Sequence, residues 1–351
     1  MSTMTSLTSL ESRDLYTVGW ISALSIERAA ATAMLDERHE KPLNFAQPHS
    51  DKNSYTWGRI GEHNVVIASL PAEVYGTTSA AATALTMLSS FPHIRIGLMV
   101  GIGAGIPRPE QGYDIRLGDI VVSQSNGTSG GVIQYDLVKV KKNQLENRGF
   151  LNMPPQALLK AIANLQAEHE PGSCKVPQFL EEMVKRYFNL AESNPRKPSY
   201  VYQGFKNDRL FEAAYDHVNG SDCCNCESNW QIKHHERTST EPEVHYGIVA
   251  SSNTLVKNIV VRDLLLRLTG EKCICFEMEA AGLMNNFPCL VIRGICDYAD
   301  SHKNDQWQKY AAATAAAYAK ELLGCIPSED LKMTQKATDV LNESESPLGT
   351  F

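Results

Sequence analysis

The sequence lacks both a long hydrophobic run and an excess of basic residues. A membrane-spanning helix needs about twenty apolar residues in succession, and no stretch of the 351 residues reaches that length. Acidic residues outnumber basic ones by 40 to 33, so the formal net charge is −7. Proteins that hold nucleic acid through its phosphates are usually basic. We therefore expect neither a membrane nor a nucleic acid as a partner.

The first residues also lack the pattern of a secretory signal, in which a basic segment precedes an apolar one. The nine cysteines are an odd number, and most of them lie in apolar runs such as KCICF and GIC. This use of cysteine is typical of reduced thiols in a cytosolic protein. We therefore expect a cytoplasmic protein.

Apolar strand patterns and helix patterns alternate along most of the chain. The runs YTVGWISAL, RIGLMVGIG and CLVIRGICDYAD read as strands, and helix patterns follow the first run and the last one. Continuous apolar strands separated by helices are typical of a sheet that is covered on both faces. We predict an α/β fold, a single-domain three-layer αβα sandwich with a central mixed, mostly parallel sheet. Ligands of such sheets bind at the carboxyl ends of the strands.

Composition also predicts the domain boundaries. Residues 1–14 are rich in serine and threonine, and residues 327–351 are polar without an evident core face, so we expect both segments to be disordered tails. The domain then covers 15–326. Residues 190–243 interrupt the alternation with polar and turn residues, and we interpret them as an insertion.

The insertion contains a pair of cysteines with CxxC spacing, Cys223 and Cys226, followed by His234 and His235. A structural zinc site needs four ligands in a tetrahedral arrangement. Two adjacent histidines do not have the spacing of a metal-binding pair. We therefore predict no metal ion, and the role of the insertion stays open.

Three acidic positions stand beside predicted strands. Glu277 and Glu279 lie in the apolar run CFEMEAAGLM, and Asp297 ends the strand that also carries Arg293. Glu27 lies in the first turn of the first predicted helix. A buried carboxylate is costly unless it is paired, hydrogen-bonded or used in catalysis. Taken singly, each acid is also typical of a helix start or a cap.

Glycines follow the strand that begins at residue 95, in the stretch MVGIGAGIP. A dinucleotide-binding fingerprint would need a small residue at Ile106, and a Walker motif would need Gly-Lys-Ser/Thr. The glycines therefore indicate either tight packing or a backbone that approaches a ligand. Acids around such a pocket suit a reaction through an oxocarbenium-like transition state, which needs negative groups, a base for water and an acid for the leaving group.

At this point the sequence resembles the nucleoside phosphorylase superfamily, and most of all its fungal branch. This superfamily includes purine and uridine phosphorylases and the methylthioadenosine/S-adenosylhomocysteine nucleosidases. Seven motifs carry the resemblance, in order from about residue 16 to about 325: TVGWISALSIERAAA, LPAEVYGTTSAAATALTML, LMVGIGAGIP, DIRLGDIVVS, YGIVASSNTLVK, FEMEAAG and VIRGICDYADSHKND.

The resemblance implies roles for individual residues. Glu279 would bind the ribose hydroxyls, Met278 would pack on the sugar, and Glu277 would support the site. Asp297 would act as the acid at N7 of a purine, with Cys296 in place of the serine of many members. The remaining substrate-binding residues that we predict are Leu255, Val256, Ile102, Gly103 and Thr77.

The reaction class depends on the positions that hold phosphate in the phosphorylases. There an arginine and a serine or threonine bind the anion, whereas this chain has Met99 and Ile102, and neither can bind a dianion. Glu27 matches the glutamate that activates water in the nucleosidases. We predict a purine nucleoside N-ribohydrolase of purine salvage that needs no cofactor and forms a homo-oligomer, with a dimer favoured.

Two alternatives remain at this stage. The first is a phosphate-dependent purine nucleoside phosphorylase whose anion is held by other residues, such as Arg108 or Arg116. The second is a nucleoside-sensing module that binds its ligand without turning it over.

Overall fold

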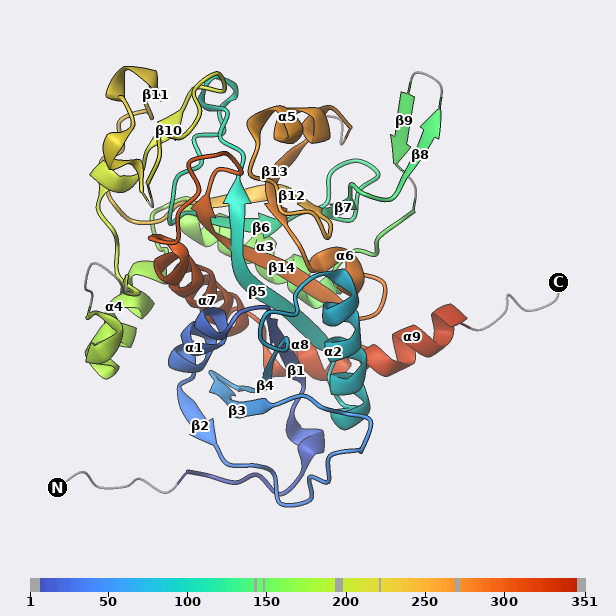
Figure 1. The fold of residues 1–351 in the computed structure, drawn as a ribbon. Coiled ribbons are helices and arrows are strands. Elements are labelled where there is room, and N and C mark those ends of the chain that lie inside the picture. Colours follow the sequence, from blue (N-terminus) through green and yellow to red (C-terminus); the bar gives the residue numbers. More distant parts are fainter. Residues whose placement is uncertain are drawn as a thin grey trace.

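The computed structural model describes residues 7–141, 144–147, 149–192, 198–220, 222–268 and 272–345. The chain is built around a ten-stranded mixed sheet (Figure 1). Four parallel strands form its middle: β4 (His63–Ser69), β1 (Val18–Ser22), β5 (Ile96–Gly105) and β14 (Cys289–Asp297). β1 and β14 are buried at every residue, as expected for strands covered on both faces.

The two sides of this sheet end differently. Beyond β4, the antiparallel strands β3 (Tyr55–Ile60) and β2 (Glu37–His39) form an edge, and β3 and β4 make a hairpin. Beyond β14 lie β6 (Ile120–Ser123), β12 (Val244–Ser251) and β13 (Cys273–Glu277), with β7 (Val132–Gln134) also paired to β12. β13 in turn pairs antiparallel with the end of β5, at Cys275 and Gly105. This part of the sheet therefore closes into a ring.

Helices cover both faces of the sheet, and the three-layer αβα prediction is confirmed (Figure 1). One face is covered by α1 (Ser25–Met34), α3 (Gln156–His169), α4 (Val176–Arg186) and α7 (Gln308–Gly324). The opposite face is covered by α2 (Thr77–Ser90) and the short α6 (Ala280–Leu283). The helix α5 spans Ile259–Leu268. The strands β8 (Val138–Lys141) and β9 (Gln144–Asn147) form a hairpin that is separate from the main sheet.

Small side chains bring α7 close to the sheet. Most residues of this helix are buried, and most of the buried ones are alanines. A Cβ atom on Gly294 of β14 would lie 1.8 Å from the carbonyl oxygen of Ala311 in α7. Only glycine permits this approach of helix and strand backbones, so α7 rests directly on the strand that ends at Asp297.

The terminal segments correct part of the prediction. Residues 328–345, expected to belong to a disordered tail, form α8 (Ser328–Met333) and α9 (Ala337–Glu345). Leu331 and Ala337 are buried, and the amide of Ala337 donates to the carbonyl of Ile94. At the other end, Thr8 pairs with His39 in a β-bridge. Few apolar residues are needed to anchor such short segments, so the polar composition concealed them. Residues 1–6 and 346–351 lie outside the described residues.

The insertion packs on the domain through charged contacts, as far as it is described; 193–197 and 221 lie outside. It contains the short pair β10 (Leu210–Phe211) and β11 (Gln231–Ile232) and the 3₁₀ turns η4 (Phe205–Asn207), η5 (Cys223–Asn225) and η6 (Ser228–Trp230). Arg237 bonds the buried Asp119 at 2.8 Å, and His234 bonds Asp114 at 2.7 Å. These pairs hold the insertion beside the carboxyl end of β14.

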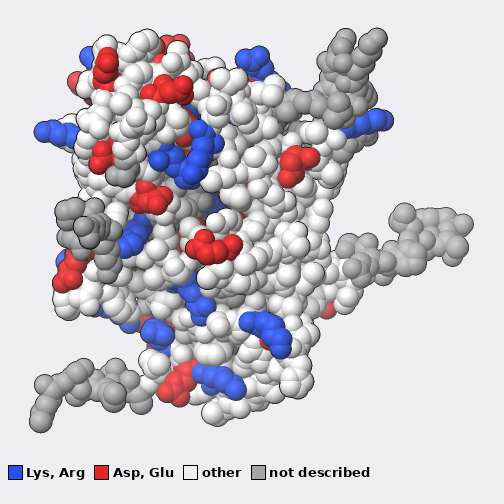
Figure 2. Space-filling model, viewed as in Figure 1, with Lys and Arg blue, Asp and Glu red and all other residues white. Residues whose placement is uncertain are grey.

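Across the described residues, no helix combines the length and the apolar character that a bilayer crossing demands. The face in Figure 2 intersperses lysine and arginine with aspartate and glutamate. This mixture matches the acidic balance of the sequence and contains no broad basic strip.

Candidate active site

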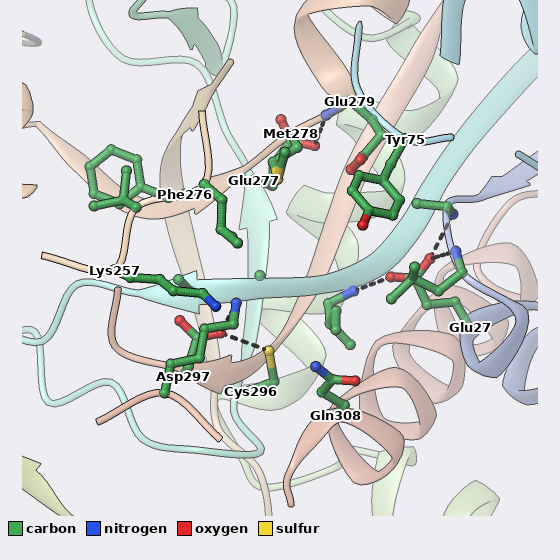
Figure 3. A pocket seen from close by; sticks show the side chains of 18 of the residues that line it. Glu27, Tyr75, Lys257, Phe276, Glu277, Met278, Glu279, Cys296, Asp297 and Gln308 are labelled. Carbon is green, nitrogen blue, oxygen red and sulfur yellow. Dashed lines mark hydrogen bonds and ion pairs between the residues drawn. The ribbon is translucent and has the colours of Figure 1, made fainter. Parts of the chain in front are cut away.

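A cavity of about 430 Å³ opens at the carboxyl ends of β1, β13 and β14, beside β5 (Figure 3). Its lining includes every predicted catalytic and substrate-binding residue except Thr77: Glu27, Ile102, Gly103, Leu255, Val256, Glu277, Met278, Glu279 and Asp297. Thr77 instead begins α2, and its hydroxyl donates to the side chain of Asn253 at 3.1 Å. The structure therefore brings together segments that lie far apart in the sequence, but it does not add Thr77 to them.

Arg293 organises the acids at one side of the cavity. Its fully buried guanidinium pairs with Glu277 and lies 3.2 Å from a carboxylate oxygen of Glu279. The backbone amides of Glu279 and Ala280 also donate to Glu277, at 3.0 Å. Burial lowers the pKa of Arg293, but Glu277, Glu279 and Glu27 outweigh it and raise that pKa. The guanidinium thus stays charged and partly neutralises the acids.

Glu279 carries a strongly shifted pKa. Its side chain is buried, and burial together with the nearby charges of Glu277 and Glu27 raises the pKa to about 7, although Arg293 opposes the shift. Glu279 can therefore exist both as an acid and as a carboxylate near neutral pH. Perturbed carboxyls in a cleft are typical of functional sites.

Glu27 is held by three backbone amides. One carboxylate oxygen accepts from Ala23 at 2.6 Å and Leu24 at 2.9 Å, and the other accepts from Ile102 at 2.8 Å. The first two bonds cap α1, so the side chain also stabilises the helix start. Burial raises the pKa of Glu27, against the effects of Arg293 and of these amides. Since a carboxylate has about four acceptor positions, one remains for a water molecule.

Close packing fixes the position of Glu27. A Cβ atom on Gly101 of β5 would lie 2.3 Å from its Oε1 atom and 2.6 Å from Arg293. A larger residue at this point would displace both charged groups. The glycine-rich stretch thus permits tight packing around the acids.

Asp297 stands at the end of β14 and is held from several sides. The ammonium of Lys303 lies 2.8 Å from its Oδ2 atom, and the amide of Ala299 donates to its Oδ1 atom at 3.0 Å. The thiol of Cys296 also bonds Oδ2, at 3.2 Å. Ala299 has a φ of 55°, so the chain turns sharply just after the acid.

The cavity has two chemically different ends, as Figure 3 shows. Asp297, Cys296 and Lys257 lie at one end, and Glu27, Glu279 and Tyr75 lie at the other. This separation suits a ligand with a nitrogen-rich part and a hydroxyl-rich part.

Sequence reasoning missed several lining residues, among them Lys303, Tyr75, Phe276 and Gln308. Lys303 follows Asp297 within the same motif, VIRGICDYADSHKND, and a cation so close to a candidate acid was a usable signal. Tyr75 is an exposed aromatic in a loop, where periodicity carries no information. Leu255 is half exposed, and Val256 is buried.

The cavity contains few cations. Lys257 and Lys303 are its basic residues among the described part of the chain, and Lys303 is paired with Asp297. Met99, at the position of the phosphorylase arginine, is fully buried. Arg108 bonds the carbonyl of Cys273, and Arg116 pairs with Asp114; neither residue is part of the described lining.

Comparisons with known proteins agree with this fold. No protein-family model matches the chain. A nucleotide-binding leucine-rich repeat (NLR)-like protein of Hyaloscypha variabilis is 46% identical over 317 residues, which cover 90% of this chain but 30% of that protein. The ATP nucleosidase Cap17 of Escherichia coli is 33% identical over 91 residues, which cover 23% of this chain and 18% of Cap17. The chain thus spans less than a third of the length of these relatives.

Solved structures show the fold more widely. A methylthioadenosine/S-adenosylhomocysteine nucleosidase of Neisseria meningitidis, in complex with methylthio-immucillin-A, has a TM-score of 0.51 at 17% identity and covers 88% of this chain and 99% of its own. A futalosine hydrolase of Helicobacter pylori has a TM-score of 0.51 at 14% identity and covers 89% of this chain and 99% of its own. A nucleosidase homologue of Borrelia burgdorferi bound to adenine has a TM-score of 0.55 at 15% identity and covers 88% of this chain and 99% of its own.

The sheet, the helical layers and these neighbours define the fold of the chain. The chain has the nucleoside phosphorylase and nucleosidase fold, which confirms the resemblance drawn from the seven motifs.

Proposed function

We propose that this chain is a nucleosidase that hydrolyses the N-glycosidic bond of a purine ribonucleoside to free base and ribose. One observation carries the proposal. Glu27, Glu277, Glu279 and Asp297 converge on one cavity, and the described lining offers no arginine that could hold phosphate. Water therefore fits the site as nucleophile better than an anion does.

The acids would stabilise the transition state at the sugar. As the bond from C1′ to the base breaks, positive charge develops on the ribose ring. When they are ionised, the carboxyls of Glu27, Glu277 and Glu279 outnumber the single guanidinium and make this part of the cavity negative. Fixed negative groups in a site shielded from water favour that charge strongly. Glu279 would also bind the ribose hydroxyls, with Met278 packed on the sugar.

Glu27 would activate the water. It faces the end of the cavity that contains Glu279, as Figure 3 shows, and its amide contacts aim the carboxylate. Water is a weak nucleophile and needs a base within hydrogen-bond reach. Glu27 takes one proton from water while the remaining hydroxide bonds to C1′.

Asp297 would receive the leaving base. A purine gains a proton at N7 as its bond to C1′ breaks, and Asp297 would pass to N7 a proton that it takes from the Lys303 ammonium beside it. Lys303 would hold the Asp297 carboxyl in position, since its ammonium lies 2.8 Å away. The protons then balance, because one leaves the water for Glu27 and another passes from the Lys303 ammonium through Asp297 to the base.

A base-release assay tests the proposal. Purified protein is incubated with adenosine, guanosine, inosine, methylthioadenosine and ATP, in phosphate-free buffer and again with phosphate. Cap17 is named an ATP nucleosidase, so ATP is included to test the 5′ substituent. We expect free base and free sugar, without acceleration by phosphate. Ribose 1-phosphate as the product would contradict the hydrolase proposal and support the phosphorylase.

A non-catalytic sensing module is the second candidate, and the NLR-like relative favours it. In that case the purine would bind with no base released from any of the substrates. We further propose that the chain forms a homodimer, which sedimentation of the purified chain would test. We also propose that the reaction needs no cofactor.

A further inference from the structure

Three side chains of the insertion, called here the Cys–His cluster, lie together outside the cavity. They are His217, Cys223 and Cys226, and each offers one ligand atom within 4.8 Å of the other two. The 3₁₀ turn η5 brings the cysteines together, because the amide of Cys226 donates to the carbonyl of Cys223 at 3.0 Å. The sequence pointed instead to His234, which bonds Asp114, and to His235, which is exposed.

A fourth side chain beside the Cys–His cluster is buried and incompletely bonded. His302 lies in the loop after β14, and its Nε2 atom has no hydrogen-bond partner among the described residues. Its ring centre is 5.5 Å from that of His217, and its carbonyl oxygen is 3.8 Å from the Cys223 sulfur. A buried imidazole nitrogen without a partner is costly, so something further is expected to bind it.

The surroundings of the Cys–His cluster orient its members. The guanidinium of Arg209 donates to the carbonyls of Cys223 and Cys226, the latter at 2.8 Å. Nε2 of His217 lies 3.0 Å from the carbonyl of Asp222. A histidine that donates one ring nitrogen to a carbonyl presents the other as a metal ligand, and such outer contacts are usual around metal sites.

We propose that the Cys–His cluster and His302 bind one zinc ion. Two thiolates and two imidazoles are the ligand set of many structural zinc sites, and soft sulfur ligands select zinc over harder cations. Ideal tetrahedral zinc places its ligand atoms roughly 3.3–3.8 Å apart. The three ligand atoms of the Cys–His cluster lie within 4.8 Å of one another, so they need only small movements to meet that geometry.

The zinc ion would join the insertion to the active-site loop. His302 directly precedes Lys303, which pairs with Asp297, while the other ligands belong to the insertion. A second cavity, of about 330 Å³, lies between these two segments and is lined by Cys223, His302 and Asp297 among others. The ion would thus restrain the loop that carries Lys303. The assignment of the ligands does not depend on the proposed reaction.

Metal analysis of the purified 351-residue chain tests the proposal. We expect about one zinc per chain by plasma mass spectrometry, as for a single structural site. Cobalt(II) added to zinc-depleted, reduced protein should produce a thiolate-to-cobalt charge-transfer band, which zinc(II) then abolishes. This titration needs no variant, so a folding defect cannot obscure it. The absence of both zinc and a charge-transfer band would overturn the proposal. A disulfide between Cys223 and Cys226 in protein purified without reductant would overturn it as well.

Matched variants assign the ligands. Cys223→Ser, Cys226→Ser, His217→Ala and His302→Ala should each weaken zinc binding by at least tenfold in a competition with a chelating dye. Cys224→Ser and His235→Ala are the controls, because both residues belong to the insertion and are exposed. Both variants should bind zinc as the wild type does. Unchanged binding in His302→Ala would remove His302 from the site, and loss of binding in Cys224→Ser would overturn the assignment.

Discussion

Lys303 places its ammonium nitrogen 2.8 Å from a carboxylate oxygen of Asp297, and both residues line the cavity. Burial lowers the pKa of Lys303, but Asp297 and the nearby Cys296 raise it more. The two side chains therefore form a charged pair at the end of the cavity assigned to the purine.

This pair predicts the effect of replacing Lys303. Lys303→Met should lower kcat by roughly 10- to 150-fold, the equivalent of a charge-assisted hydrogen bond of about 1.5–3 kcal/mol. Lys303→Arg should recover much of that loss, because it keeps the charge. Steady-state base release with adenosine and inosine measures both variants.

A positioning role has a second signature. If Lys303 acts through Asp297 at N7, its replacement should matter little for a 7-deaza nucleoside, which has no N7 to protonate. Equal losses on the normal and the 7-deaza substrate would show that Lys303 has only a structural role.

Replacement of Asp297 itself should affect the chemical step more than binding. Asp297→Asn should lower kcat by roughly 10²–10⁴, the usual range for a general acid, while the purine still binds. Single-turnover rates and a direct binding measurement by calorimetry separate the two. Near-normal turnover would show that another group protonates the base.

Glu27 decides between base catalysis and a purely structural helix cap. Glu27→Gln should lower hydrolysis by at least about 10², because the amide cannot accept the proton of water. The variant keeps one side-chain oxygen for the amides of Ala23 or Leu24, so purine binding and helicity should be retained. Circular dichroism and base release are measured on the same sample. A variant that stays active would leave Glu27 as a helix cap only.

Glu279 predicts how stability depends on pH. Its pKa is about 7 in the folded chain against the usual 4.5, so the folded state holds more protons than the unfolded state between these values. The stabilising contribution is present at low pH and is lost as pH rises through about 7. Relative to Glu279→Gln, the wild type should therefore lose unfolding free energy from about pH 4.5 to above pH 7. Urea unfolding of both proteins at several pH values measures the difference, and parallel curves would contradict the assigned shift.

Gly294 predicts a large effect far from the chemistry. Gly294→Ala places a methyl group 1.8 Å from the carbonyl oxygen of Ala311, so β14 and α7 must separate. We expect a loss of about 3 kcal/mol or more in the free energy of unfolding, at or above the upper end for overpacked sites. Gly324→Ala, in the last turn of α7 with open space around the new atom, is the control. It should be neutral or stabilise by about 0.5–1 kcal/mol.

The sequence was informative where burial conflicts with residue type. Glu277, Glu279 and Asp297 stand in or beside strongly apolar strands, so their carboxyls demanded either partners or a function. The structure provides the partners, Arg293 for Glu277 and Lys303 for Asp297. Periodic apolar runs likewise predicted the central strands and the helices that cover them.

Contacts between distant segments were harder to predict. The pairing of β5 with β13 depends on how a long strand bends, which no local pattern records. His217 and His302 are 85 positions apart, and their approach follows from the packing of the insertion. The helices α8 and α9 bury too few apolar residues to show a clear amphipathic period.

The alanine-rich face of α7 has a consequence for the stiffness of the cavity. Alanine has no rotamers to lose, so burying this face costs almost no side-chain entropy. It also leaves no alternative side-chain packings between which the helix could shift. The first residue of α7, Gln308, lines the cavity, and Asp297 ends the strand beneath the helix. The distance between these two residues is therefore set by direct contact between the backbones of α7 and β14. Ligand binding could change that distance only by moving the helix relative to the strand.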